Sequence, residues 1–176
     1  MLRRTYSVVM VAAAFLLSSC AAETTHMSEL AELAVPEGDI VLEVRGNLAR
    51  INGDGVAQFD MAMLMALPSV QLKTSTSVTD GVRLFEGVLV RDLLKSLGAQ
   101  GHIVSATARN KYVIDIPFTD FERFDAIIAY RMDGEPMDNQ DKGPLWIVYP
   151  RDVHSQLQDI RYDYRWVWQL KALEIK

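Results

Sequence analysis

The chain has 176 residues, of which 49% are hydrophobic, a formal net charge of −5 and one cysteine. This length suits one domain with a proper hydrophobic core and excludes two full-sized domains. One cysteine excludes an intrachain disulfide and every zinc or iron–sulfur site that needs several cysteines. The acidic balance, without any basic block, argues against a nucleic-acid partner.

The first twenty residues have the pattern of an export signal. Arg3 and Arg4 form a positively charged start, and residues 8–17 are an unbroken apolar run. This run is too short to cross a bilayer, because a membrane-spanning helix needs about 20 residues, and it has the length of a secretory signal. The small residues before Cys20 also allow ordinary signal cleavage near Ala22.

Leu17-Ser18-Ser19-Cys20 resembles the lipobox of bacterial lipoproteins. The resemblance implies that residues 1–19 are removed and that Cys20 becomes an N-terminus alkylated with diacylglyceride. Ala21 is not the acidic retention signal of inner-membrane lipoproteins. We therefore expect a protein that is anchored through its lipid on the periplasmic side of the envelope, in the outer membrane.

The domain is expected to cover residues 38–176, after a small, acidic tether over 20–37. Its first strand is predicted over 40–46, which is rich in β-branched and aliphatic residues. The turn residues Asn-Gly-Asp-Gly at 52–55 predict a hairpin between about 48 and 59.

A short helix and a strand are predicted next. Asp60 is expected to cap a helix that runs to Leu67 and ends at Pro68. Strict alternation over 70–78 predicts a strand. One face of that strand would carry Val70, Leu72, Thr74, Thr76 and Val78. An apolar stripe predicts an amphipathic helix over 89–97, which Gly98 would stop.

The rest of the chain is predicted to be mostly strands. These cover residues 102–108, 112–116, 126–132, 145–149 and 165–175, with a helical turn from Thr119, as its cap, to Phe124. In the last strand, side chains 166, 168, 170 and 172 are expected opposite side chains 167, 169, 171 and 173. Helices are too few for a βαβ series, so the fold class is α+β with mixed β-sheets and a few short helices.

Short motifs in a fixed order resemble the small, stand-alone branch of the oxidoreductase molybdopterin-binding domain family, which has the sulfite-oxidase fold. The motifs are Phe59-Asp60, Leu67-Pro68, Leu72-x-Thr74-x-Thr76, Phe85-x-Gly87, Ala108-x-Asn110-x-Tyr112, Met132-Asp133-Gly134, Lys142-Gly143-Pro144-Leu145, Tyr149-Pro150-x-Asp152 and Trp168-Gln169-Leu170. The resemblance covers about residues 38–176. It implies the α+β fold of mixed sheets that the pattern of elements also favours.

Two departures from that family concern its cofactor. In catalytic members, molybdenum is bound by a pyranopterin dithiolene and by one cysteine thiolate of the protein. The matching stretch, residues 72–78, holds threonine and serine but no cysteine, and hydroxyl groups are poor ligands for a soft metal. Trp146 stands where the resemblance places an arginine for the pterin phosphate. We therefore expect no cofactor, although the resemblance keeps molybdopterin open.

The candidate ligand-binding residues are those that the resemblance places around the former cofactor cleft. They are Thr74, Thr76, Asn110, Tyr112, Lys142, Gly143 and Arg165. Each also has a purely structural explanation, as a half-buried strand threonine, a turn residue or a solvated cation. Aromatic residues crowd positions 146–168, which favours core packing and leaves a binding pocket or a partner surface as alternatives. The three histidines are widely separated, so no metal site is expected.

The sequence therefore predicts a binding or sensory module and assigns no catalytic residue. Its ligand would be an unidentified small molecule. The resemblance alone suggests that the module accompanies a membrane signalling receptor. Two alternatives stay open: an oxidoreductase that holds molybdopterin without a protein thiolate, and an envelope scaffold that docks a partner through its aromatic C-terminal surface.

Overall fold

The computed structural model describes residues 32–176, so the expected signal peptide, the lipidation site Cys20 and most of the tether lie outside the described residues. In the described part, two β-sheets carry most of the regular structure and the helices are short. None of these helices is long and apolar enough to cross a membrane.

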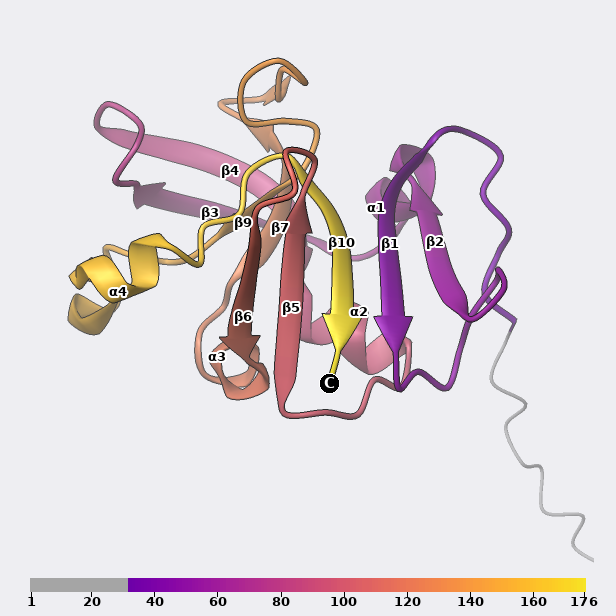
Figure 1. Cartoon of the computed structure of the whole chain (residues 1–176). Coiled ribbons are helices and arrows are strands. Elements are labelled where there is room, and N and C mark those ends of the chain that lie inside the picture. Colours follow the sequence, from indigo (N-terminus) through magenta and orange to yellow (C-terminus); the bar gives the residue numbers. More distant parts are fainter. Residues whose placement is uncertain (1–31) are drawn as a thin grey trace, which may run out of the picture. The chain divides into compact units, whose positions relative to one another are not determined.

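The first sheet contains both ends of the domain. Its strand order is β2-β1-β10-β5-β6. The strands are β1 (Ile40–Gly46), β2 (Val56–Asp60), β5 (Ile103–Ala108), β6 (Val113–Pro117) and β10 (Leu170–Ile175). β1 pairs in parallel with β10, whereas the other neighbours are antiparallel, so the sheet is mixed. Figure 1 shows these five strands side by side, with β6 as the edge strand nearest α4.

The second sheet is antiparallel and is built around β7. Its strands are β3 (Ser69–Ser75), β4 (Val82–Leu89), β7 (Ile127–Met132), β8 (Glu135–Pro136) and β9 (Trp146–Val148). The order is β3-β4-β7-β8, and β9 also pairs with β7. Figure 1 shows the β3–β4 hairpin extending past the edge of the first sheet, above α4. This leaves β3 as an edge strand close to the C-terminal segment.

Short helices connect the strands. They are α1 (Met61–Ala66), α2 (Val90–Ser96), α3 (Phe118–Arg123) and α4 (Ile160–Asp163), with a 3₁₀ turn, η1, over Ser155–Gln158. The predicted cap of α1 is confirmed, because Asp60 Oδ1 accepts a hydrogen bond of 2.8 Å from the N–H of Met63. The predicted stop of α2 is also confirmed: Gly98 has a φ of +62°, a left-handed conformation that favours glycine.

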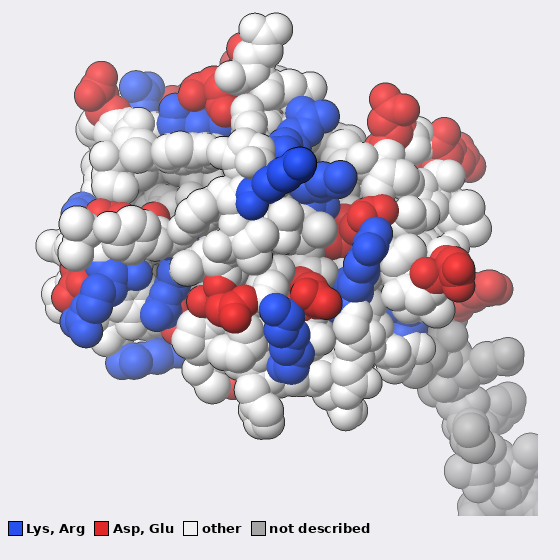
Figure 2. Space-filling view, viewed as in Figure 1, with Lys and Arg blue, Asp and Glu red and all other residues white. Residues whose placement is uncertain are grey.

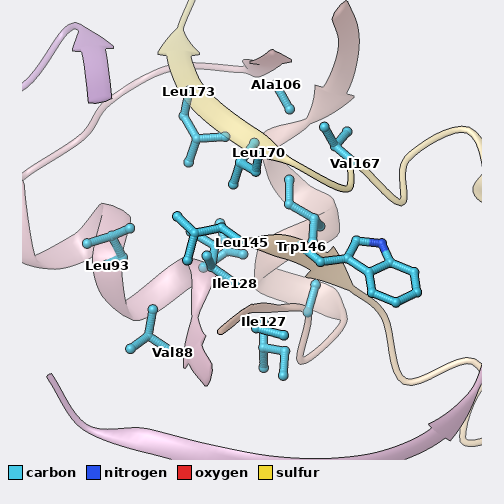
Figure 3. Close-up of a cluster of buried hydrophobic side chains, with 14 of the residues drawn as sticks. Val88, Leu93, Ala106, Ile127, Ile128, Leu145, Trp146, Val167, Leu170 and Leu173 are labelled. Atoms are coloured by element: carbon cyan, nitrogen blue, oxygen red, sulfur yellow. The ribbon is translucent and has the colours of Figure 1, made fainter. Parts of the chain in front are cut away.

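The hydrophobic core lies between the sheets and includes one face of α2. Figure 3 shows part of it, with buried side chains converging from both sheets and from α2. The labelled residues are Val88, Leu93, Ala106, Ile127, Ile128, Leu145, Trp146, Val167, Leu170 and Leu173. Leu93 and Leu94 come from the predicted apolar stripe of α2 and are buried in this core. The observed layers confirm the predicted class of mixed sheets with few short helices.

One predicted strand is absent and another is shorter in the structure. Residues 48–51 form no strand, because the Asn52 side chain bonds both the N–H and the carbonyl of Gln58 and holds residues 47–55 as a loop. The hairpin partner of β2 is β1 instead. β3 ends at Ser75. The carboxylate of Asp152 accepts the Ser75 N–H at 2.6 Å, so this N–H is not available to a neighbouring strand. Val78 consequently lies in an exposed turn.

Two local predictions are wrong. Thr119 does not cap α3: the helix begins at Phe118, whose N–H bonds the His102 carbonyl. The regular alternation predicted over 165–175 is also absent. Gln169 has a φ of +48°, and Trp166 and Val167 are both buried although they are neighbours. The strand β10 therefore begins only at Leu170.

Candidate functional site

A groove of about 420 Å³ lies where three segments meet. One segment follows β3, the second is the turn between β5 and β6, and the third runs from α4 toward β10. Its lining residues are Ser77, Val78, Ala108, Asn110, Tyr112, Ile160, Asp163, Tyr164, Trp166, Val167 and Trp168. A concave, largely apolar surface with a few polar groups is typical of small-molecule sites.

Asn110 and Tyr112 are the two predicted site residues that line this groove. Asn110 Oδ1 accepts the N–H of Tyr112 at 2.9 Å, which shapes the tight turn between β5 and β6. The Tyr112 hydroxyl donates to the carbonyl of Tyr164 at 2.9 Å. Burial raises the pKa of Tyr112, and the nearby Tyr164 hydroxyl adds to this, so the phenol stays a donor at neutral pH. The two walls of the groove are therefore tied together.

Asp163 and Trp166 supply polar groups that have no hydrogen-bond partner among the described residues. They are the Asp163 Oδ1 and the indole Nε1 of Trp166, and both atoms are buried. Asp163 is also the one charged residue in the groove lining. We did not single out Asp163 from the sequence, because an isolated aspartate in a polar stretch has no distinguishing pattern.

Thr74 and Thr76 are buried and do not line the groove. Thr74 Oγ1 donates to the Ser75 carbonyl and accepts the N–H of Asp152 at 3.3 Å. Thr76 Oγ1 lies 2.7 Å from Thr79 Oγ1 and accepts the N–H of Val78. Ser75 between them donates its hydroxyl to Asp152 at 2.5 Å. These hydroxyls hold the end of β3 to the turn at Asp152 and to its own loop.

Lys142 and Gly143 also lie outside the groove lining. Lys142 Nζ bonds both carboxylate oxygens of Asp141 and lies 6.0 Å from the centre of the Trp168 ring. Gly143 packs tightly against the backbone, since a Cβ there would lie 2.2 Å from the Met137 carbonyl oxygen. Its N–H donates to the Asp138 carbonyl at 2.7 Å. Both residues thus shape the loop that precedes β9.

Arg165 forms an ion pair with Asp120 of α3. The Asp120 side chain is 9% exposed and that of Arg165 22%, so the pair is largely withdrawn from water. The Arg165 guanidinium also lies 4.5 Å from the Tyr162 ring, and Asp120 accepts the Tyr149 hydroxyl at 3.4 Å. Burial, followed by the charge of Asp120, raises the pKa of Tyr149 well above its usual value. The charge of Arg165 is therefore engaged in the fold.

The aromatic cluster divides between core and groove. Trp146 is fully buried and Trp166 is 5% exposed, and their rings pack 6.1 Å apart. The exposed members are Tyr164 (59%), Tyr112 (40%) and Trp168 (37%), all of which line the groove. Core packing thus accounts for Trp146 and Trp166, whereas Tyr112, Tyr164 and Trp168 are exposed in the groove lining.

A second hollow, of about 380 Å³, lies elsewhere on the first sheet. Its lining includes Arg109, Lys171, Asp39, Asn139 and Pro144. Figure 2 shows basic side chains gathered near the β5–β6 turn, whereas the rest of that face mixes both signs of charge. Arg109 and Lys171 are lining residues of this second hollow and not of the aromatic groove.

The two mixed sheets and the groove at the end of β3 define an α+β domain of the sulfite-oxidase type. Residues 42–156 match the family described as "Oxidoreductase molybdopterin binding domain". The match covers more than half of the chain, and the chain belongs to this family. No curated protein matches the sequence.

One similar solved structure is the crystal structure of the sulfane dehydrogenase SoxCD from Paracoccus pantotrophus. The TM-score is 0.59 at 15% sequence identity, and the match covers 81% of this chain. This degree of likeness concerns the fold. The chain spans 39% of the length of the chain that it matches.

The family implies a molybdopterin cofactor, but the donors present do not fit that group. The only cysteine of the sequence is Cys20, so residues 32–176 offer no thiolate. At the end of β3 the hydroxyls of Thr74, Ser75 and Thr76 are all engaged in hydrogen bonds. The groove lining contains neither lysine nor arginine to bind a phosphate. Among residues 32–176 there is also no group of three or more His, Cys, Asp or Glu side chains that could hold a metal ion.

Proposed function

We propose that this protein is a lipid-anchored envelope protein whose domain binds a small molecule in the aromatic groove. The supporting observation is the groove itself, which lies beside the end of β3 and has a lining suited to an organic ligand. The proposed module has no redox role, because neither a thiolate nor a cationic phosphate site is present at the groove. A membrane signalling receptor is the partner class that we propose for it.

Metal analysis separates this proposal from a molybdopterin enzyme. The protein would be purified from its native host grown with ample molybdate, and its molybdenum content measured against protein concentration. We expect a content far below one atom per chain. A stoichiometric content would overturn the proposed function.

Native mass spectrometry of the same preparation tests the binding role and the anchor together. We expect the mass of a protein that begins at Cys20 and carries lipid, together with a fraction that retains a small molecule. The Trp168→Ala variant should lose the retained molecule but keep the lipid, since Trp168 lines the groove. A preparation that never retains a small molecule would contradict the binding role, and a Cys20→Ser variant with unchanged lipid mass would contradict the anchor.

A further inference from the structure

Asp163 is the one charged residue in the lining of the aromatic groove. The lining contains no lysine, arginine or histidine. The neighbouring cations along the chain are engaged elsewhere: Arg161 pairs with Asp159, and Arg165 pairs with Asp120. An unpaired carboxylate in an apolar setting is costly, and a positively charged ligand would reduce that cost.

The buried Oδ1 of Asp163 supports the same conclusion. It has no hydrogen-bond partner among the described residues, and a buried acceptor without a partner costs free energy. A ligand that carries a positive charge or an N–H donor would remove this cost. The Nε1 of Trp166, which is 95% buried as a residue and also has no partner, would suit an oxygen acceptor on the same ligand.

Three exposed rings line the groove around this carboxylate: Tyr112, Tyr164 and Trp168. The face of an aromatic ring carries negative electrostatic potential and attracts cations, most strongly in tryptophan. The Trp168 ring already has a cation nearby, since Lys142 Nζ lies 6.0 Å from its centre. That ammonium is neutralised by both oxygens of Asp141, so it does not compensate Asp163.

Building on the proposed binding function, we propose that the groove selects an organic cation, a protonated amine or a quaternary ammonium compound. The cation would lie among the rings of Tyr112, Tyr164 and Trp168, with Asp163 as its counter-ion. This preference is opposite in charge to that of a site for a phosphate-bearing cofactor. The groove would therefore differ from the cofactor site of its family in the sign of the charge that it accepts.

Two probes of equal shape test the role of charge. Choline carries a quaternary nitrogen, and dimethylbutanol is its neutral counterpart with carbon in place of nitrogen. Their affinities for the mature protein, in a non-ionic detergent, would be measured by calorimetry and by tryptophan fluorescence. We expect choline to bind at least about tenfold more tightly. Equal affinities would overturn this inference and leave the proposed binding function standing.

Failure of binding by both probes would also overturn the inference. The proposed function would then still be judged separately, by the small molecule that native mass spectrometry detects. Benzoate serves as an anionic probe, and we expect it to bind more weakly than either of the other two. Tighter binding of benzoate than of choline would reverse the assigned charge preference.

Variants locate the effect in the groove. Asp163→Asn keeps the shape and removes the charge, and it should weaken choline binding about tenfold while changing dimethylbutanol binding little. Trp168→Leu should act in the same direction, because an apolar side chain without a π face remains. Asp54→Asn is the matched control, since Asp54 is exposed in the β1–β2 loop and lies outside the groove lining. Unchanged choline affinity in a folded Asp163→Asn protein would contradict the proposal.

Discussion

The hydroxyl of Tyr112 donates a hydrogen bond of 2.9 Å to the backbone carbonyl of Tyr164, across 52 positions of the sequence. This bond connects the β5–β6 turn to the segment that follows α4. Those two segments form facing parts of the groove lining. The width of the groove therefore depends on a contact between two separate parts of the chain.

Replacement of Tyr112 by phenylalanine should loosen this connection. The ring remains, so the groove keeps its apolar lining, but the carbonyl of Tyr164 loses its donor. We expect the free energy of unfolding to fall by about 0.5–1 kcal/mol. Urea unfolding measures this change, and affinity for a groove ligand should fall several-fold in the same protein. A loss of stability without any loss of affinity would show that the bond does not shape the groove.

Loss of Arg165 should destabilise the fold and leave the groove lining intact. Arg165→Ala leaves the buried carboxylate of Asp120 without its cation, which should cost about 2–4 kcal/mol. The matched control is Arg45→Ala, because Arg45 pairs with Glu43 at the surface with 57% of its side chain exposed, so its loss should affect stability little. Comparison of the two urea midpoints checks this. Equal effects would contradict the structural role of Arg165.

Acid should weaken the fold over a defined range of pH. Hydrogen bonds from Arg161 lower the pKa of Asp159 from 3.8 to about 2, and hydrogen bonds from Ser75 lower the pKa of Asp152. A carboxyl whose pKa is lower in the folded state stabilises the fold at pH values above its unfolded-state pKa. That stabilisation is lost as the pH falls through the folded-state pKa. Stability should therefore decrease from about pH 4 to pH 2. Urea midpoints across this range should change less in an Asp159→Asn variant, and an unchanged slope would refute this assignment.

Gly143 should tolerate no side chain. A Cβ at this position would lie 2.2 Å from the carbonyl oxygen of Met137, so the loop before β9 would have to move. We expect Gly143→Ala to lower the free energy of unfolding by about 1–3 kcal/mol. Gly38→Ala is the control, because its Cβ would make only ordinary contacts of 3.6 Å with Asp60. Thermal unfolding of both variants would show the difference, and similar melting temperatures would contradict the packing role.

Local signals predicted the elements whose ends are set by neighbouring residues. Asp60 and Gly98 define helix ends through contacts within a few positions, and both predictions are confirmed. Long-range contacts changed the other elements. Asp152 ends β3 through a bond across 77 positions, and the His102 carbonyl takes the first N–H of α3. Sequence patterns do not contain such partners.

The candidate site shows the same limit. Asn110 and Tyr112 were predicted and line the groove, whereas the lining residues Ser77, Asp163 and Tyr164 were not singled out. The density of aromatic residues near the C-terminus was a usable signal, but it did not separate buried Trp146 from exposed Trp168. Trp146 lies in β9, which pairs with β7, whereas Trp168 lies outside the named strands.

The fold class and the absence of a cysteine from residues 72–78 follow from sequence patterns alone, because alternation, turn residues and residue identity are local properties. Which charges are available depends on the folded chain. Arg165 is neutralised by Asp120, 45 positions away, while Asp163, two residues before it, has a buried oxygen without a partner among the described residues. Charge pairing depends on distances of a few ångströms, which only the folded chain sets.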